Sequence, residues 1–149
     1  MERLIKKYID KLSPTCQDEG GENFAYAVFR IVVSLMFFLH GTQKIFGFFG
    51  GVDGMGGTVP VAGLIWFAGL IEVVVGALVF FGVFTRLASL VAVIEMLIAY
   101  LIVHLPAGLN PILNKGELAI MYLVSFLVIF RYGGGKMSLG KKYCKYEKS

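Results

Sequence analysis

The sequence predicts an all-α integral membrane protein, a bundle of four transmembrane helices preceded by a short amphipathic interfacial helix. Two observations lead to this fold class. Apolar residues make up 57% of the 149-residue chain and charged residues 16%, whereas soluble domains contain about 45–50% and about 25%. The apolar residues also gather in four long runs, each close to the ~20 residues that a helix needs to cross the hydrocarbon core.

The four runs are interrupted only by single polar residues. We expect helices over approximate residue ranges 24–46, 61–84, 86–105 and 115–131. Strands of a membrane barrel would alternate polar and apolar residues, and these runs do not. Pro60 precedes the second run and Pro106 follows the third, while Asn114 and Glu117 form a pattern like a helix capping box before the fourth. Residues 24–132 are therefore predicted to form the transmembrane domain.

The first 23 residues contain an amphipathic segment. In "RLIKKYIDKL", residues 3–12, apolar side chains fall on one helical face and basic side chains on the other. This pattern predicts a short helix lying on an anionic membrane surface. A helix packed against the end of the bundle is the alternative. Residues 1–23 are thus expected to be a cytoplasmic N-terminal segment, and residues 133–149 a basic cytoplasmic tail.

The distribution of basic residues predicts the orientation. Of the 14 Lys and Arg residues, only Lys44 and Lys115 fall at one end of the predicted bundle, and the other twelve fall at the opposite end. Because basic residues remain on the cytoplasmic side, both termini are expected in the cytoplasm of a multi-pass plasma-membrane protein. The loops at 48–60 and 105–114 would then face outward.

Charge and cysteine usage exclude several classes of protein. The net charge of +4 comes from the flanks of the membrane segments, so it indicates contact with lipid headgroups and not with nucleic acid. The two cysteines, Cys16 and Cys144, lie in the two polar tails and form no metal-binding spacing. We therefore expect no metal site.

Three ionisable residues lie within the predicted helices, where a charge near the bilayer centre costs about 2.5–3.5 kcal/mol. Arg30, Glu72 and Glu95 each share a helical face with small residues, the faces that membrane helices use for packing. We expect them to point into the bundle, with Arg30 paired to Glu72 or Glu95. Such a polar interior fits a site for a quinone headgroup, a proton or a small substrate. The alternative is a buried ion pair that fixes the order of the helices.

A second group of titratable residues is expected near the outer ends of the helices. His40 and Lys44 are one helical turn apart, His104 ends the third predicted helix, and Glu117 begins the fourth. At least two of these side chains are expected to converge beneath the outer loops. Each also has a simpler explanation, since lysine reaches toward lipid headgroups, histidine suits a helix C-terminus and glutamate suits a helix N-terminus.

Several of these residues belong to recognisable motifs. The chain resembles the DoxX/DoxD family of small four-helix membrane proteins over roughly residues 29–139. The resemblance rests on Arg30, "HGTQK" (40–44), "GLIEVVVGALVFFGVFTRLAS" (69–89), "GELA" (116–119) and "GGGKMSLG" (133–140). It implies a four-helix membrane fold. It leaves function open, because some members resemble subunits of thiosulfate:quinone oxidoreductase, others associate with redox-defence enzymes, and distant relatives act as chaperones or cargo receptors.

Two functional hypotheses follow. In the first, the protein is a redox-linked membrane subunit that interacts with a quinone, with His40, Glu72 and Glu95 as catalytic residues for proton transfer. Its substrate-binding residues would be Arg30, Lys44, His104 and Glu117, and electrons would come from a partner redox protein or a soluble reductant. In the second, the bundle binds or transports a small molecule or lipid, or acts as a chaperone, without catalysis. Expected partners are the lipid bilayer, a quinone or other amphiphile, and a redox protein or second copy of the chain.

Overall fold

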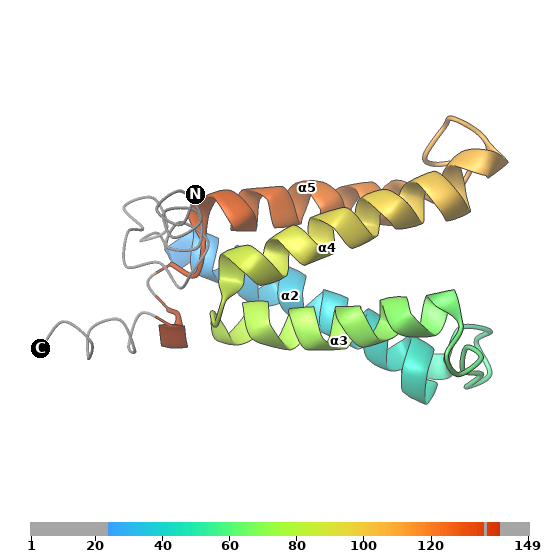
Figure 1. Ribbon diagram of the computed structural model, residues 1–149, viewed down its shortest axis with the longest axis horizontal. Coiled ribbons are helices and arrows are strands. Elements are labelled where there is room, and N and C mark those ends of the chain that lie inside the picture. The colour runs from blue at the N-terminus through green and yellow to red at the C-terminus, as the bar shows by residue number, and fades with distance from the viewer. Residues whose placement is uncertain (1–23, 136, 141–149) are drawn as a thin grey trace, which may run out of the picture.

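The computed structural model describes residues 24–135 and 137–140, and its long elements are four α-helices (Figure 1). They are α2 (Phe24–Phe46), α3 (Leu64–Phe81), α4 (Thr85–Ala99) and α5 (Glu117–Tyr132). The all-α fold is thus confirmed over the described residues. The predicted interfacial helix and most of the basic tail fall on residues 1–23 and 141–149, which lie outside the described residues.

Short helical turns extend or follow these helices. A 3₁₀ turn, η1 (Phe48–Gly50), follows α2, while the π-helical turn η2 (Tyr100–His104) and the 3₁₀ turn η3 (Leu105–Ala107) continue α4. Within the described part of the chain, three helices are long and apolar enough to span a membrane, over Phe24–Phe46, Leu64–Phe81 and Thr85–Ala107. The 16 residues of α5 extend about 24 Å, so a fourth crossing stays a prediction.

The bundle consists of two helix pairs. α2 packs mainly on α3, and α4 packs mainly on α5. A tight turn joins α3 to α4, and Figure 1 shows these two helices close together at this turn but diverging toward their other ends. The start of α2 and the end of α5 lie at the same end as the turn, since the Tyr26 hydroxyl donates a hydrogen bond to the Gly133 carbonyl oxygen and Arg30 of α2 donates to the Phe80 carbonyl in the last turn of α3.

Glycines allow α2 and α3 to approach closely. A Cβ atom at Gly41 of α2 would lie 2.6 Å from the carbonyl oxygen of Gly69, and one at Gly76 would lie 2.8 Å from the backbone nitrogen of Phe38. Both distances are too short for carbon, so only glycine fits. The expected packing role of the Gly69 and Gly76 face is confirmed, and its partner is α2 of the same chain.

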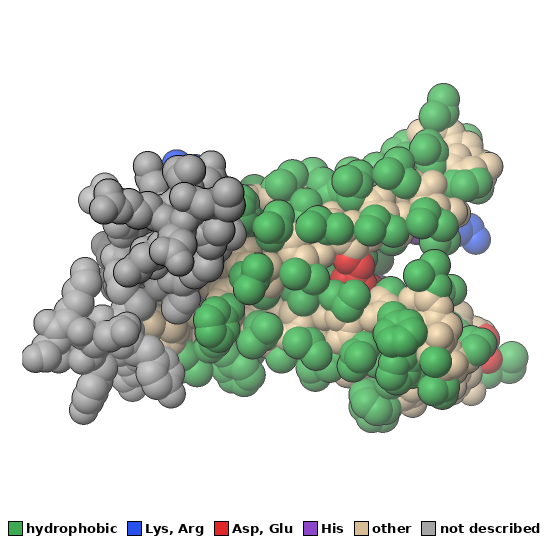
Figure 2. All heavy atoms as spheres, viewed as in Figure 1, with side chains coloured by type: hydrophobic (Ala, Val, Ile, Leu, Met, Phe, Trp, Pro, Cys, Tyr) green, Lys and Arg blue, Asp and Glu red, His purple; other side chains and the backbone are tan. Residues whose placement is uncertain are grey.

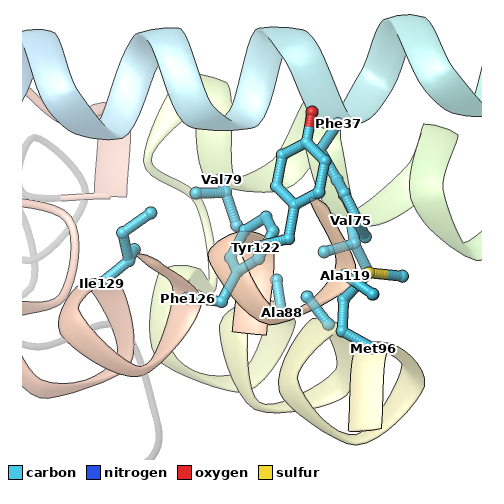
Figure 3. Packing of buried hydrophobic residues seen from close by; sticks show 10 residues of the cluster. Phe37, Val75, Val79, Ala88, Met96, Ala119, Tyr122, Phe126 and Ile129 are labelled. Carbon is cyan, nitrogen blue, oxygen red and sulfur yellow. The ribbon is translucent and has the colours of Figure 1, made fainter. Parts of the chain in front are cut away.

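A hydrophobic core joins the two pairs (Figure 3). Phe37 of α2 contacts the rings of Tyr122 and Phe126 of α5, with centroids 5.1 and 4.7 Å apart and near-perpendicular planes. Val75 and Val79 contribute from α3. Large apolar side chains on the opposite faces of the same helices remain exposed (Figure 2), as expected of helices that contact lipid and not water.

Two helix starts differ from the sequence prediction. α3 begins at Leu64 and not at Val61, because the Gly63 amide hydrogen-bonds to the Pro60 carbonyl and closes a turn there. The N-cap of α5 is Gly116, and its amide donates to the side-chain oxygen of Asn114. Asn114 therefore holds the preceding loop instead of capping the helix.

Candidate functional site

An ion pair joins α2 to α3 inside the bundle. The Lys44 Nζ atom lies 2.6 Å from Oε1 of Glu72, and the Glu72 side chain is only 4% exposed. Lys44 lies near the end of α2, next to Gly69, and its side chain reaches Glu72 within the membrane-spanning part of α3. The second carboxyl oxygen of Glu72 has no hydrogen-bond partner among the described residues. Oε2 of Glu72 can therefore still accept a hydrogen bond.

The expected pairing of Arg30 with Glu72 or Glu95 is wrong. The guanidinium of Arg30 instead donates hydrogen bonds to the carbonyl oxygens of Val79, of Phe80 at 2.7 Å and of Met137 at 2.6 Å. The first two carbonyls belong to the last turn of α3, where the helix dipole favours a cation. Arg30 and Lys44 are 14 residues apart on one helix, so their backbone positions are separated by about 21 Å along its axis.

The C-terminal motif completes this contact around Arg30. Gly82, at φ 72°, ends α3 in the left-handed region, and a Cβ atom there would lie 2.4 Å from Cβ of Ser138. The Gly140 amide donates to the Gly82 carbonyl at 3.3 Å. Residues 137–140 of this motif thus lie against the α3–α4 turn, and Arg30 connects the two segments.

Glu95 of α4 is buried without a partner. Only 9% of the residue is exposed, and neither carboxyl oxygen has a hydrogen-bond partner among the described residues. A buried polar group normally has such a partner, and a carboxyl group in lipid needs a proton or a cation. Because Lys44 is already paired with Glu72, the Glu95 carboxyl group remains available to bind a molecule that enters the bundle.

Glu95 lines a groove between the diverging parts of α3 and α4. The groove has a volume of about 480 Å³, which lies within the range of small-molecule sites. Lys44 and His104 are its other ionisable lining residues, and its walls are apolar. The wall residues come from both helices: Leu64, Ile65, Phe67, Ala68, Ile71, Val91, Ile94, Ile98, Ala99, Ile102 and Val103. Figure 2 shows acidic side chains at the base of this hollow, surrounded by hydrophobic ones.

His104 is held in place by the loop before α5. Its Nδ1 atom lies 3.0 Å from the Asn114 carbonyl oxygen, and because a carbonyl only accepts, Nδ1 carries the hydrogen. The Asn114 side chain donates to the Gly108 carbonyl at 2.7 Å and so ties both ends of the loop together. His104 is therefore oriented at the wall of the groove, with its Nε2 atom available to a ligand.

The remaining predicted site residues lie elsewhere. His40 packs edge-on against the ring of Tyr122, with centroids 5.8 Å apart, and it does not line the groove. Glu117 is exposed at the start of α5. Of the four outer residues, the structure brings Lys44 and His104 to one groove, together with Glu95 from the predicted interior group.

Gln43 has a structural role that no sequence pattern indicated. Its side chain donates to the Gly51 carbonyl at 2.8 Å, and the Val59 amide donates to the Lys44 carbonyl at 3.1 Å. These bonds fasten the loop between α2 and α3 above the Lys44–Glu72 pair. The position of Gln43 directly before Lys44, at the end of an apolar helix, was the available signal.

A carboxylate also organises this loop. Asp53 Oδ1 accepts hydrogen bonds from the Met55 and Gly57 amides, both at 2.8 Å. These two donors favour the ionised form and hold the pKa of Asp53 below its usual value. The loop is thus a defined structure over the outer end of α2.

Comparison with known proteins identifies the family. The DoxX family model matches residues 25–105, more than half of the chain. The protein belongs to the DoxX family. A protein of Haemophilus influenzae, named only as uncharacterized, is 40% identical over 122 residues, covering 80% of this chain and 90% of its own length. A second uncharacterized H. influenzae protein is 34% identical over 68 residues, covering 46% of this chain and 45% of its own. No solved structure matches this chain.

The DoxX match includes all the residues that line the groove, among them Lys44, Glu95 and His104. It also includes Glu72, the partner of Lys44, whereas Glu117 falls outside it. Together with the apolar helices, the match establishes a DoxX-family membrane protein. The two H. influenzae relatives are named only as uncharacterized, so the groove is the feature that bears on function.

Proposed function

We propose that this DoxX-family protein is a redox-linked membrane subunit that binds a quinone in the groove between α3 and α4. The observation that carries the proposal is the buried, unpartnered carboxyl group of Glu95 in an apolar groove of about 480 Å³. A quinone combines a polar ring carrying two carbonyl acceptors with an apolar tail. Such a molecule fits a groove whose polar groups are few and whose walls are hydrocarbon.

Hydrogen-bond donors for the ring would come from the base of the groove. A protonated Glu95 donates one hydrogen bond, and the Lys44 ammonium has N–H groups beyond the one directed at Glu72. His104 presents Nε2 on the same wall, and this atom would donate to the ring only after taking up a proton, because the hydrogen of the neutral imidazole is on Nδ1. The tail would lie among the wall residues of α3 and α4, continuous with the lipid-exposed faces of both helices.

Reduction of a quinone to a quinol consumes two electrons and two protons. We assign delivery of one proton to Glu95 and of the second to His104, which would first take up a proton at Nε2, while the Lys44–Glu72 pair positions the ring. The electrons would come from a partner redox protein or from a soluble sulfur reductant such as thiosulfate. Arg30, His40 and Glu117 are left out of this site because their contacts lie outside the groove.

The proposed placement is a plasma-membrane protein with four crossings and both termini in the cytoplasm. Its support is the charge asymmetry, with Lys44 and Lys115 alone at the outer end, and the location of the start of α2 and the end of α5 at one end of the bundle. In this orientation the groove opens toward the outer leaflet.

A non-enzymatic role is the second candidate. An apolar groove that opens sideways between two helices also suits the binding or transport of a lipid, or the transient binding of another membrane helix. The apolar walls suit lipid binding as well as they suit a quinone tail. The identity of the molecule bound in the groove distinguishes the redox function from the non-enzymatic one.

The test begins with the full-length protein purified in mild detergent. Its organic extract is examined for quinone by ultraviolet spectroscopy and mass spectrometry, and membranes containing the protein are offered thiosulfate or another sulfur donor. We expect a co-purifying quinone and donor-dependent quinone reduction. Extracts that contain lipid but no quinone, together with no reduction above that of membranes lacking the protein, would refute the redox function and favour the second candidate.

Ala99→Trp places an indole in the groove, and Leu97→Trp places one on the exposed face of the same helix. The first variant should lose the quinone and the second should keep it. Equal quinone content in both would contradict the assignment of the groove.

A further inference from the structure

The charges around the groove do not balance. One cation, Lys44, faces two carboxyl groups, Glu72 and Glu95, and the short contact of Lys44 is with Glu72. The other cation buried within the described helices, Arg30, donates to backbone carbonyls of Phe80 and Met137, at the opposite end of α2 from Lys44. Among the described residues, an ionised Glu95 therefore has no cation that is not already paired.

The other titratable groups near Glu95 do not supply that cation. His104 of η2 donates from Nδ1 to the Asn114 carbonyl, and His40 of α2 packs on Tyr122 of α5. In a low-dielectric groove, Glu95 must either carry a proton or receive a cation from a bound molecule. A proton and a cation would compete for the same two carboxyl oxygens.

We propose that the groove binds lipophilic monovalent cations, such as hydrophobic quaternary ammonium or phosphonium ions, in exchange for the proton of Glu95. The cation's charge lies against the Glu95 carboxylate, and its apolar substituents lie between α3 and α4, among residues such as Phe67, Ile98 and Ile102. Each bound cation releases one proton, so that the charge of the groove is unchanged. This function uses the same groove as the quinone but does not depend on quinone binding.

Three features of the groove support this assignment. The Glu95 carboxyl group, which lines the groove and is 91% buried, would complement the charge of a bound cation. The walls are apolar on both helices, so they exclude strongly hydrated inorganic cations and suit organic ones. The groove lies between membrane-exposed helix faces, where a lipophilic cation concentrates.

The test uses tetraphenylphosphonium, whose charge does not change with pH. Purified wild-type protein is titrated at several pH values by calorimetry, and proton release is measured in weakly buffered solution. We expect affinity to rise about tenfold per pH unit while Glu95 is protonated in the free protein, with one proton released per cation bound. The neutral molecule triphenylphosphine oxide should bind without proton release. Binding of the cation that is independent of pH and releases no proton would overturn the proposal.

Variants of Glu95 test the role of its carboxyl group in cation binding. Glu95→Gln should lose cation affinity by at least tenfold and should release no proton on binding, since an amide can neither ionise nor balance the charge of the cation. Glu95→Asp should keep measurable cation binding with its pH dependence, and Leu97→Trp should match the wild type. A folded Glu95→Gln protein that binds the cation as tightly as the wild type would overturn the proposal. The proton-release measurement decides the question on wild-type protein if the Gln variant does not fold.

Discussion

The Nζ atom of Lys44 lies 2.6 Å from the Glu72 carboxylate, and this contact joins the C-terminal end of α2 to the middle of α3. The ion pair stabilises the α2–α3 unit, because Glu72 is almost fully buried and has no other cation within hydrogen-bond distance among the described residues. The pair also leaves Glu95 without a cation and so determines the chemistry of the groove.

Replacing Lys44 with methionine should destabilise the protein. The substitution leaves the Glu72 carboxyl buried and unpaired, at a cost toward the lower end of the about 3–5 kcal/mol typical of breaking a buried pair, since Lys44 is 25% exposed. Thermal unfolding in detergent measures the loss. The double variant Lys44→Met, Glu72→Gln should recover much of it. Lys115→Met, an exposed control, should have no effect, and equal stability of Lys44→Met and Lys115→Met would contradict the pairing.

Arg30→Gln should destabilise the protein without altering the groove. The variant loses three hydrogen bonds from a charged donor to carbonyl oxygens of α3 and the C-terminal motif, each worth about 1.5–3 kcal/mol. We expect a loss of about 3 kcal/mol or more in unfolding free energy. Affinity for the groove ligand should remain within about twofold of wild type at temperatures where the variant is folded. A selective loss of ligand at unchanged stability would assign Arg30 to binding, as first expected from its position in the sequence.

Gly76→Ala should force α2 and α3 apart. The new methyl group would overlap the backbone of Phe38, and overpacking of this kind costs about 1–3 kcal/mol. Val74→Ile adds one methylene on the exposed face of the same helix and serves as the control. The melting temperature of Gly76→Ala should fall while that of the control is unchanged. If both variants melt like the wild type, the close approach of the helices is wrong.

The outer loop should loosen at acidic pH. Hydrogen bonds from the Met55 and Gly57 amides hold the pKa of Asp53 below its ordinary value of 3.8. A group with a depressed folded pKa stabilises the structure above its unfolded pKa, and its contribution is lost as the pH falls through the folded pKa. Amide exchange of Met55 and Gly57, corrected for the intrinsic pH dependence, should therefore rise below about pH 4. Asp53→Ala should show the faster exchange already at neutral pH, and protection that is equal in both proteins would contradict this role.

Much of the fold follows from the sequence, for reasons that act along one helix. The bounds of α2 agree with prediction, and the small-residue faces that carry Gly41, Gly69 and Glu72 are buried as expected. Apolar runs and small residues decide these features locally, without reference to other segments. The start of α3 was misplaced because Pro60 and Gly63 close a turn that hydropathy does not detect.

The pairing of charges did not follow from the sequence. Arg30, Lys44, Glu72 and Glu95 all face the interior, but partner choice depends on the antiparallel register of α2 and α3, which close glycine contacts determine. The sequence pattern is the same for Lys44, whose side chain reaches a carboxylate, and for Arg30, whose side chain binds backbone carbonyls. The groove is likewise a property of the divergence of α3 and α4 and not of either helix alone.

The central claim is that the groove between α3 and α4 holds the protein's ligand, and photo-crosslinking tests it most directly. A photoreactive quinone added to membranes containing the full chain, followed by peptide mass spectrometry, should label residues 64–71 of α3 and residues 91–104 of α4 and η2. Excess unmodified quinone should suppress the labelling, and so should Ala99→Trp but not Leu97→Trp. Suppressible labelling confined to α2 and α5, or labelling that Ala99→Trp leaves unchanged, would contradict the account.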